Sequence, residues 1–203
     1  VTNIFINSLN SQYVKSSFTL CYENIFQSLY HLNVMSNFSQ KLKIFLDSRK
    51  IFKNWYAYPK IYFGLSDNQF PVFETKSGLK IKIRKDSTDL MALTHVWMIG
   101  EYERKNFEIN DDDTVIDVGG HIGLFSLYAA QFCKNGQIFT FEPAKENFNL
   151  LSENMISNNL KNVRCFNLAV TNSNSSVKLF LNDDDSGHSI HSKSSQSITV
   201  NST

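Results

Sequence analysis

The feature that most constrains the fold is a glycine turn between an apolar strand and an apolar helix, in the stretch DTVIDVGGHIGLFSLYAA at residues 113–130. Residues 115–118 predict a short buried strand, and the residues from Leu124 to Cys133 predict a helix that is apolar nearly all round. A strand that passes directly into a helix is typical of α/β proteins. The turn therefore marks either a binding site or a merely tight connection.

Strands and helices continue to alternate after this turn. The sequence predicts a strand at residues 137–142, a helix at 144–157 and a further strand at 162–170. Strands separated by helices of about 10–15 residues indicate a parallel sheet. We therefore predict an α/β fold with a doubly wound sheet that helices cover on both faces.

The chain before residue 71 has a different pattern. Apolar residues recur at helical intervals over residues 1–63 and predict two or three helices, and Pro59 and Gly64 interrupt this pattern. We divide the chain into a helical N-terminal segment, residues 1–70, and a second part, residues 71–203.

The second part opens with a predicted β-hairpin in residues 71–85, which turns at Gly78. Ser87 is a predicted cap for a helix that runs to Ile99. Near the C-terminus the chain is polar and serine-rich around a predicted strand at 177–181, which an acidic run at 183–185 follows.

Composition excludes several classes of protein. The chain has 203 residues, 42% of them hydrophobic, which suffices for a buried core, and its net charge of +1 gives no general attraction to nucleic acid. We find no apolar run long enough to span a membrane and no signal peptide in residues 1–12. Three widely separated cysteines favour a reducing compartment. We expect a cytoplasmic protein with a small-molecule partner.

Basic residues alternate with aromatic residues between Lys41 and Lys60. This pattern is compatible with a membrane-surface or nucleic-acid face. A packed helix pair with a solvated basic side explains it equally simply and is the reading we favour.

In a doubly wound sheet, ligands bind beyond the carboxyl ends of the strands, where this turn lies. The dinucleotide pattern G-x-G-x-x-G fits neither at Gly119 nor in a frame that ends at Gly123. The observed pattern instead resembles the first motif of S-adenosylmethionine-dependent methyltransferases. Glu142, at the end of the next strand, is placed to accept hydrogen bonds from ribose hydroxyls, which suits NAD as well as S-adenosylmethionine.

Longer stretches carry a closer resemblance. The segments DDTVIDVGGHIGLFSLYAA, QIFTFEPAKENFNLLSENMISNNLKNVRCFNLAV and GEYE resemble the FkbM family of methyltransferases, from about Val72 to Leu181. The resemblance implies a Rossmann-like class I methyltransferase fold that binds S-adenosylmethionine and methylates a hydroxyl oxygen of a sugar or natural-product-like small molecule. The cofactor contacts that it implies are Asp117, Gly119, Gly120, His121, Gly123, Glu142 and Pro143.

Methylation of a hydroxyl requires a group that takes its proton. The candidate bases are His121, in the glycine turn, and His188 or His191 in the stretch SGHSIH. His121 could instead only shape the turn. We expect no metal site, since the acidic run at 183–185 has no partner at ligand spacing. The alternatives to a methyltransferase are an NAD-dependent enzyme and a non-catalytic module that acts through its N-terminal helices.

The family pattern continues with further strands beyond residue 203, so we expect the chain to be a fragment with an incomplete sheet. In such a fragment the strand at 115–118 would lie at an edge with unpaired backbone groups. The apolar helix from Leu124 to Cys133 would lack part of its cover. We therefore expect self-association and little or no methyl transfer.

Overall fold

A computed structural model describes residues 3–6, 38–100, 102, 108–172, 175–181 and 196–203. His188, His191, Cys21 and the acidic run at 183–185 lie outside the described residues. No helix among the described residues has both the length and the apolar character needed to cross a bilayer.

The central element is a sheet in the order β1-β4-β5-β6. Its strands are β1 (Asn3–Ile6), β4 (Thr114–Val118), β5 (Gln137–Phe141) and β6 (Val163–Phe166). The last three are parallel, as predicted, and β1 is antiparallel to β4. The predicted alternation of strands and helices after residue 113 is thus confirmed.

The expectation that the strand at 115–118 forms an edge is wrong. β1 pairs with it along its length, with Asn3 opposite Val118 and Ile6 opposite Val115. The backbone groups of β4 are therefore paired on both sides, which removes the physical reason for predicting association through this strand. Our assignment of residues 1–63 to helices missed β1 because four residues are too few to show a strand period.

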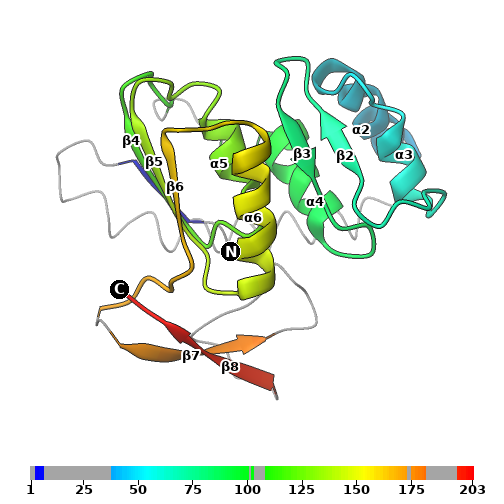
Figure 1. Ribbon diagram of the computed structural model, residues 1–203. Helices are drawn as coiled ribbons and strands as arrows, with labels where there is room; N and C mark the ends of the chain where they lie inside the picture. Colours follow the sequence, from blue (N-terminus) through cyan, green and yellow to red (C-terminus); the bar gives the residue numbers. More distant parts are fainter. Residues whose placement is uncertain (1–2, 7–37, 101, 103–107, 173–174, 182–195) are drawn as a thin grey trace.

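Both connecting helices, α5 (Leu124–Ala129) and α6 (Lys145–Ser157), lie on the same face of the sheet (Figure 1). Val115 and Ile138 point toward this face and are fully buried. The side chains on the opposite face are only partly buried; they are Ile116, Val118, Phe139, Phe141 and Phe166. Successive crossovers of one hand that proceed in one direction across a sheet place their helices on one side. Two-sided cover is thus not seen in the described part of the chain.

The helix that we expected to be incompletely covered is buried. Leu124, Phe125, Leu127 and Ala129 of α5 are each at most 3% exposed, so this expectation is wrong. The cover comes from the chain before the sheet, where Trp97 Nε1 donates to the Leu124 carbonyl at 3.2 Å. The helix also ends at Ala129 and not at Cys133.

Trp97 belongs to a helix whose two parts differ in geometry. It begins as α4 (Asp89–Thr94) and continues as a π-helical turn, η1 (His95–Ile99), which ends at Gly100 in the left-handed conformation. The N-cap of α4 is Thr88 and not Ser87, although Ser87 Oγ accepts a hydrogen bond from the Asp89 amide at 3.1 Å.

The predicted hairpin forms from β2 (Val72–Glu74) and β3 (Lys80–Lys82). Beyond it lie α2 (Phe38–Ile51) and α3 (Ala57–Tyr62), at the far end of the molecule from the sheet (Figure 1). Pro59 does not interrupt α3, because it lies in the first turn, where no backbone donor is required.

One hydrophobic cluster joins these elements to the helices of the sheet. It contains Phe52 from beyond α2, Phe73 and Ile81 from the hairpin, and Leu127 and Leu151 from α5 and α6, all fully buried. The division at residue 70 stays a prediction, and this shared core crosses it.

A second, two-stranded antiparallel sheet consists of β7 (Ser176–Leu181) and β8 (Gln196–Asn201). β7 agrees with the predicted strand, whereas β8 was not predicted. A small apolar cluster of Ala144, Ala169, Leu179 and Val200 attaches this sheet to the chain near the start of α6.

Two asparagines, one on α6 and one directly after it, take the place of a strand beside β3. Asn154 accepts from the Lys82 amide at 2.8 Å and donates to the Lys82 carbonyl at 3.0 Å. Asn158 makes the same pair of bonds with Lys80, at 2.7 and 2.6 Å. The spacing fits because four helical residues rise about 6 Å and two strand residues rise about 6.6 Å. The edge of β3 is thereby covered.

Asn154→Ala should lower the free energy of unfolding by about 2–4 kcal/mol. It removes the two bonds to half-buried Lys82 and a third, buried one, from Nδ2 to the Ile122 carbonyl at 2.9 Å. Asn158→Ala is the matched control: Asn158 is half-buried, water can replace the lost bonds, and we expect a loss of about 1 kcal/mol or less. Urea unfolding measures the free energy of unfolding of both variants. Equal losses would contradict the larger contribution that we assign to the bonds of Asn154.

Candidate functional site

The glycine turn between β4 and α5, residues 119–123, lies on the end of β5. The amides of Gly119 and Gly120 both donate to the Phe141 carbonyl, at 2.8 and 3.0 Å. Gly119 and Gly123 have φ of +79° and +85°, in the left-handed region that glycine adopts without strain. We call residues 119–123 the glycine loop.

The glycine loop packs so closely that side chains are excluded. A Cβ at Gly120 would overlap Thr140 Oγ1 and lie 2.9 Å from Leu151 Cδ1. A Cβ at Gly123 would lie 2.5 Å from Met155 Cε. Gly120 is therefore required by the contact of the loop with β5, and Gly123 by its left-handed backbone as well as by its contact with α6.

Asp117, at the end of β4, is fully buried beneath the loop. Its Oδ2 accepts from Ser126 Oγ at 2.7 Å and from Thr140 Oγ1 at 3.3 Å. Its Oδ1 is buried and has no hydrogen-bond partner among the described residues. Burial raises the pKa of Asp117 to about 6, and the two hydroxyl donors offset only part of that effect.

Glu142 follows β5 directly and is 5% exposed. Its Oε2 accepts from the His121 amide and its Oε1 from the Ala144 amide, both at 2.8 Å. One carboxylate thus joins the middle of the glycine loop to the start of α6. Burial raises the pKa of Glu142 to about 7, although both amide bonds favour its charged form.

His121 has a φ of +51°, one of two positive values among the described non-glycine residues. Its Nε2 lies 3.1 Å from Arg84 Nη2 and 3.3 Å from Asp89 Oδ1. Arg84 and Asp89 form a two-pronged ion pair, with Nε to Oδ2 at 3.0 Å and Nη2 to Oδ1 at 2.8 Å. The hairpin and α4 therefore reach the glycine loop through this imidazole.

The structure brings the predicted loop residues and Glu142 together at the ends of β4 and β5. Pro143 lies in the same turn, where Asn167 Nδ2 donates to the carbonyls of Glu142 and Pro143 at 2.8 and 3.0 Å. Whether these residues contact a cofactor stays a prediction, as does the role of His188.

Sequence reasoning missed the residues that support the loop from other elements. They are Arg84, Asp89, Ser126, Thr140, Asn154 and Asn167. Polar residues inside otherwise apolar helices and strands were the available signal, because Ser126, Thr140 and Asn154 are fully buried. Buried polar groups need partners, and the nearest partners are in the loop.

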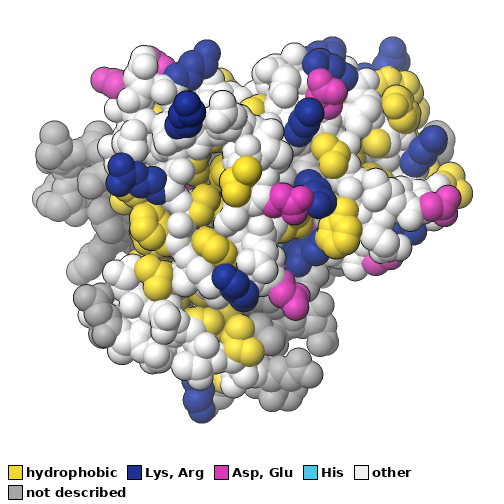
Figure 2. Space-filling model, viewed as in Figure 1, with side chains coloured by type: hydrophobic (Ala, Val, Ile, Leu, Met, Phe, Trp, Pro, Cys, Tyr) yellow, Lys and Arg dark blue, Asp and Glu magenta, His cyan; other side chains and the backbone are white. Residues whose placement is uncertain are grey.

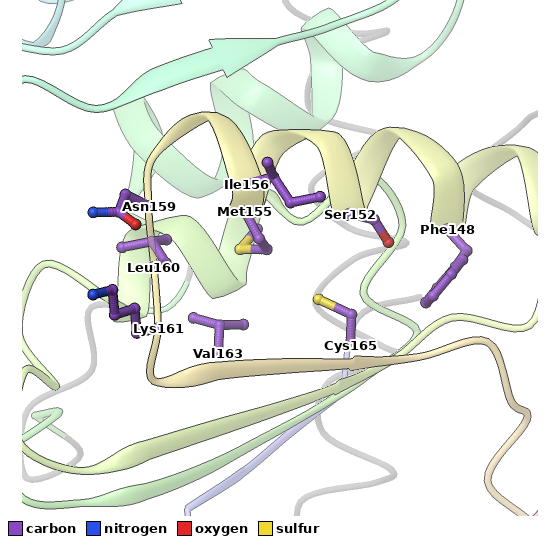
Figure 3. Close-up of a pocket in the computed structure, with 9 residues that line it drawn as sticks. All are labelled: Phe148, Ser152, Met155, Ile156, Asn159, Leu160, Lys161, Val163 and Cys165. Carbon is purple, nitrogen blue, oxygen red and sulfur yellow. The ribbon is translucent and has the colours of Figure 1, made fainter.

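A separate hollow of about 400 Å³ lies between α6 and β6. Figure 3 shows Met155 and Ser152 of α6 opposite Val163 and Cys165 of β6. Apolar side chains also reach the surface over this part of the molecule (Figure 2). Lys161 is the only charged residue among those that line it, so it offers few partners for a polar ligand. We therefore place the candidate site at the glycine loop.

The described residues contain no group of three or more His, Cys, Asp or Glu side chains that could hold a metal ion. Asp117, Glu142 and Asp89 are too dispersed around the loop to form one.

Three parallel strands, two connecting helices on one face and a glycine turn after the first strand make a mixed α/β arrangement that is consistent with a Rossmann-like fold. A stretch of 69 residues is 32% identical to Methyltransferase 1 of Beauveria bassiana (strain ARSEF 2860). The match covers 34% of this chain and 28% of that protein, so it spans less than a third of the relative's length. No family model and no solved structure matches the chain. The chain is thus similar to a methyltransferase over a third of its length.

The free energy of unfolding should fall as the pH rises from about 4.5 to about 7, the ordinary and raised pKa of Glu142. The folded protein binds this proton more tightly than the unfolded chain, so the stabilisation is complete at low pH and is lost as the pH passes the raised pKa. Asp117 should lower the free energy of unfolding in the same way between pH 3.8 and about pH 6, its ordinary and raised pKa.

Glu142→Gln should reduce this slope by up to about 1.4 kcal/mol per pH unit. Urea unfolding at a series of pH values measures it. Glu146→Gln is the control, because Glu146 is an exposed carboxylate in the first turn of α6, and it should leave the slope unchanged. Equal slopes for the wild type and Glu142→Gln would show that Glu142 does not cause the pH dependence.

Proposed function

We propose that the chain belongs to an S-adenosylmethionine-dependent methyltransferase that binds its cofactor at the glycine loop and Glu142. The similarity to a methyltransferase supports this proposal. The observation that carries it is the use of the loop amides. Those of Gly119 and Gly120 donate to Phe141, that of His121 to Glu142, and that of Gly123 to Gly120.

A loop in which four of the five amides are already used has little left to offer a phosphate. Dinucleotide sites depend on free amides at the glycine turn to bind the pyrophosphate. Here the groups that remain are carboxylates, which accept hydrogen bonds. S-adenosylmethionine has ribose hydroxyls and an ammonium group and no phosphate, so its chemistry suits this loop better than that of NAD.

The residues present fit such a cofactor. Each carboxylate oxygen has two acceptor sites, so each Glu142 oxygen retains one beyond its amide bond, enough for two ribose hydroxyls. Asp117 Oδ1 is an acceptor without a partner among the described residues, and an ammonium group is a suitable donor for it. Because Asp117 is fully buried, the glycine loop would have to move aside for such a group to reach it. The chemistry that the bound cofactor supplies is a methyl group activated by the adjacent sulfonium.

The acceptor that we propose is a hydroxyl oxygen of a sugar or natural-product-like small molecule, as in the FkbM family that the sequence resembles. Holding donor and acceptor in line supplies much of the acceleration in such a transfer. The glycine loop and Glu142 would position the donor. His188 is the proposed base, and it lies outside the described residues.

Calorimetry with S-adenosylhomocysteine and the 203-residue chain tests the proposal. We expect binding, and we expect Glu142→Ala to weaken it by about 2 kcal/mol or more, because charge-assisted bonds to ribose are lost. Glu142→Gln should cost less. Glu146→Ala, four residues away and exposed, is the control and should bind like the wild type.

Two results would contradict the proposal. One is no binding at millimolar S-adenosylhomocysteine. The other is binding of NADH at the same site in preference to S-adenosylhomocysteine, which would favour the dinucleotide alternative.

A further inference from the structure

Arg84, Asp89 and His121 form a compact group that joins the hairpin and α4 to the glycine loop, and we call it the loop brace. Asp89 is fully buried, and the side chain of Arg84 is 19% exposed. The Arg84 backbone amide also donates to Asp89 Oδ2, at 2.8 Å. Asp89 therefore accepts three hydrogen bonds from one arginine, which compensates the charge of its carboxylate.

The hydrogen-bond chemistry of this group determines the state of the imidazole. A guanidinium is always protonated and can only donate, so the 3.1 Å contact with Arg84 requires an unprotonated Nε2. The 3.3 Å contact with Asp89 requires a protonated Nε2 instead. One nitrogen cannot do both. The contact with Arg84 is shorter, and Asp89 is already compensated by that same arginine.

We propose that Arg84 and Asp89 are positioning residues, which hold His121 as a neutral imidazole with its proton on Nδ1 and thereby fix the glycine loop in its binding conformation. His121 then acts as a support for the loop and not as the catalytic base, because its Nε2 lone pair is used by Arg84. Bases must present a free lone pair to the acceptor.

The strained backbone of His121 is consistent with this role. A non-glycine residue with positive φ persists only where its surroundings hold it in place. The His121 amide is held by Glu142 Oε2, and the carbonyl of the next residue, Ile122, is held by Asn154 Nδ2 at 2.9 Å. The contact of the imidazole with Arg84 is the third restraint on these two residues.

This inference rests in part on the proposed function, since it assigns the loop a ligand, but its first test needs no ligand. Long-range ¹H–¹⁵N spectra of the imidazoles in the wild-type chain report which nitrogen carries the proton, with His121→Asn to assign the signal. We expect His121 to carry its proton on Nδ1 near neutral pH. A signal from protonated Nε2 would overturn the proposal.

Arg84→Met supplies the matching change. Without the guanidinium, Asp89 loses the bonds from Arg84 Nε and Nη2 and keeps the one from the backbone amide of residue 84. The imidazole then becomes the nearest side-chain donor to Asp89, so the proton should move to Nε2. Arg164→Met, which removes an exposed guanidinium on the other face of the sheet, should leave the signal unchanged. If Arg84→Met does not fold, the wild-type spectrum alone decides the question.

Binding of S-adenosylhomocysteine tests the consequence for the loop. Arg84→Met and His121→Asn should each weaken binding about tenfold, and the double variant should be no weaker than the worse single variant, because both act through one contact. Asparagine tolerates positive φ, so His121→Asn removes the imidazole without forcing the backbone to change. Unchanged affinity or additive losses would overturn the positioning role.

Failure of the proposed function would look different. If the wild type binds no S-adenosylhomocysteine, the methyltransferase proposal fails, while the imidazole spectra of the wild type and Arg84→Met still decide whether the loop brace exists.

Discussion

The rest of the site depends on the contact between the glycine loop and the end of β5. Two consecutive amides, of Gly119 and Gly120, donate to the carbonyl of Phe141, and this is possible only because no side chain at Gly120 separates the loop from Thr140. The next residue after Phe141 is Glu142, so the same contact places its carboxylate under the loop. The Ala144 amide, which binds that carboxylate, then starts α6.

Three buried acids surround the loop, and each is balanced in a different way. Asp89 is paired with a guanidinium, Asp117 with two hydroxyls, and Glu142 with two backbone amides. Burial raises the pKa values of Asp117 and Glu142, and their neutral donors offset only part of that effect. The expected pH dependence of the free energy of unfolding and the capacity of the two carboxylates to accept further hydrogen bonds therefore have the same origin.

The parallel sheet, the hairpin, the glycine loop and Glu142 were predictable because each is encoded in local sequence. Alternating apolar residues define β3, and the glycine pattern defines the loop. β1 and the bracing residues were not, because they depend on contacts between distant segments. Asn154 bonds to Lys82 and Ile122, and Arg84 reaches His121. Contacts of this kind produce no periodic pattern in the sequence from which they could be predicted. The error about the edge strand followed directly from the missing β1.

The balance of charge around the loop also limits the kind of ligand that it can bind. Arg84 compensates Asp89, whereas Asp117 and Glu142 have no cationic partner in the hydrogen bonds described above. A phosphate would bring further negative charge to two uncompensated carboxylates in a site of low dielectric, where like charges repel strongly. An ammonium group or a pair of hydroxyls would instead supply the donors that these carboxylates lack. Most of the loop's own amides are already satisfied within the protein, so the donors that these two carboxylates lack would have to come from the ligand.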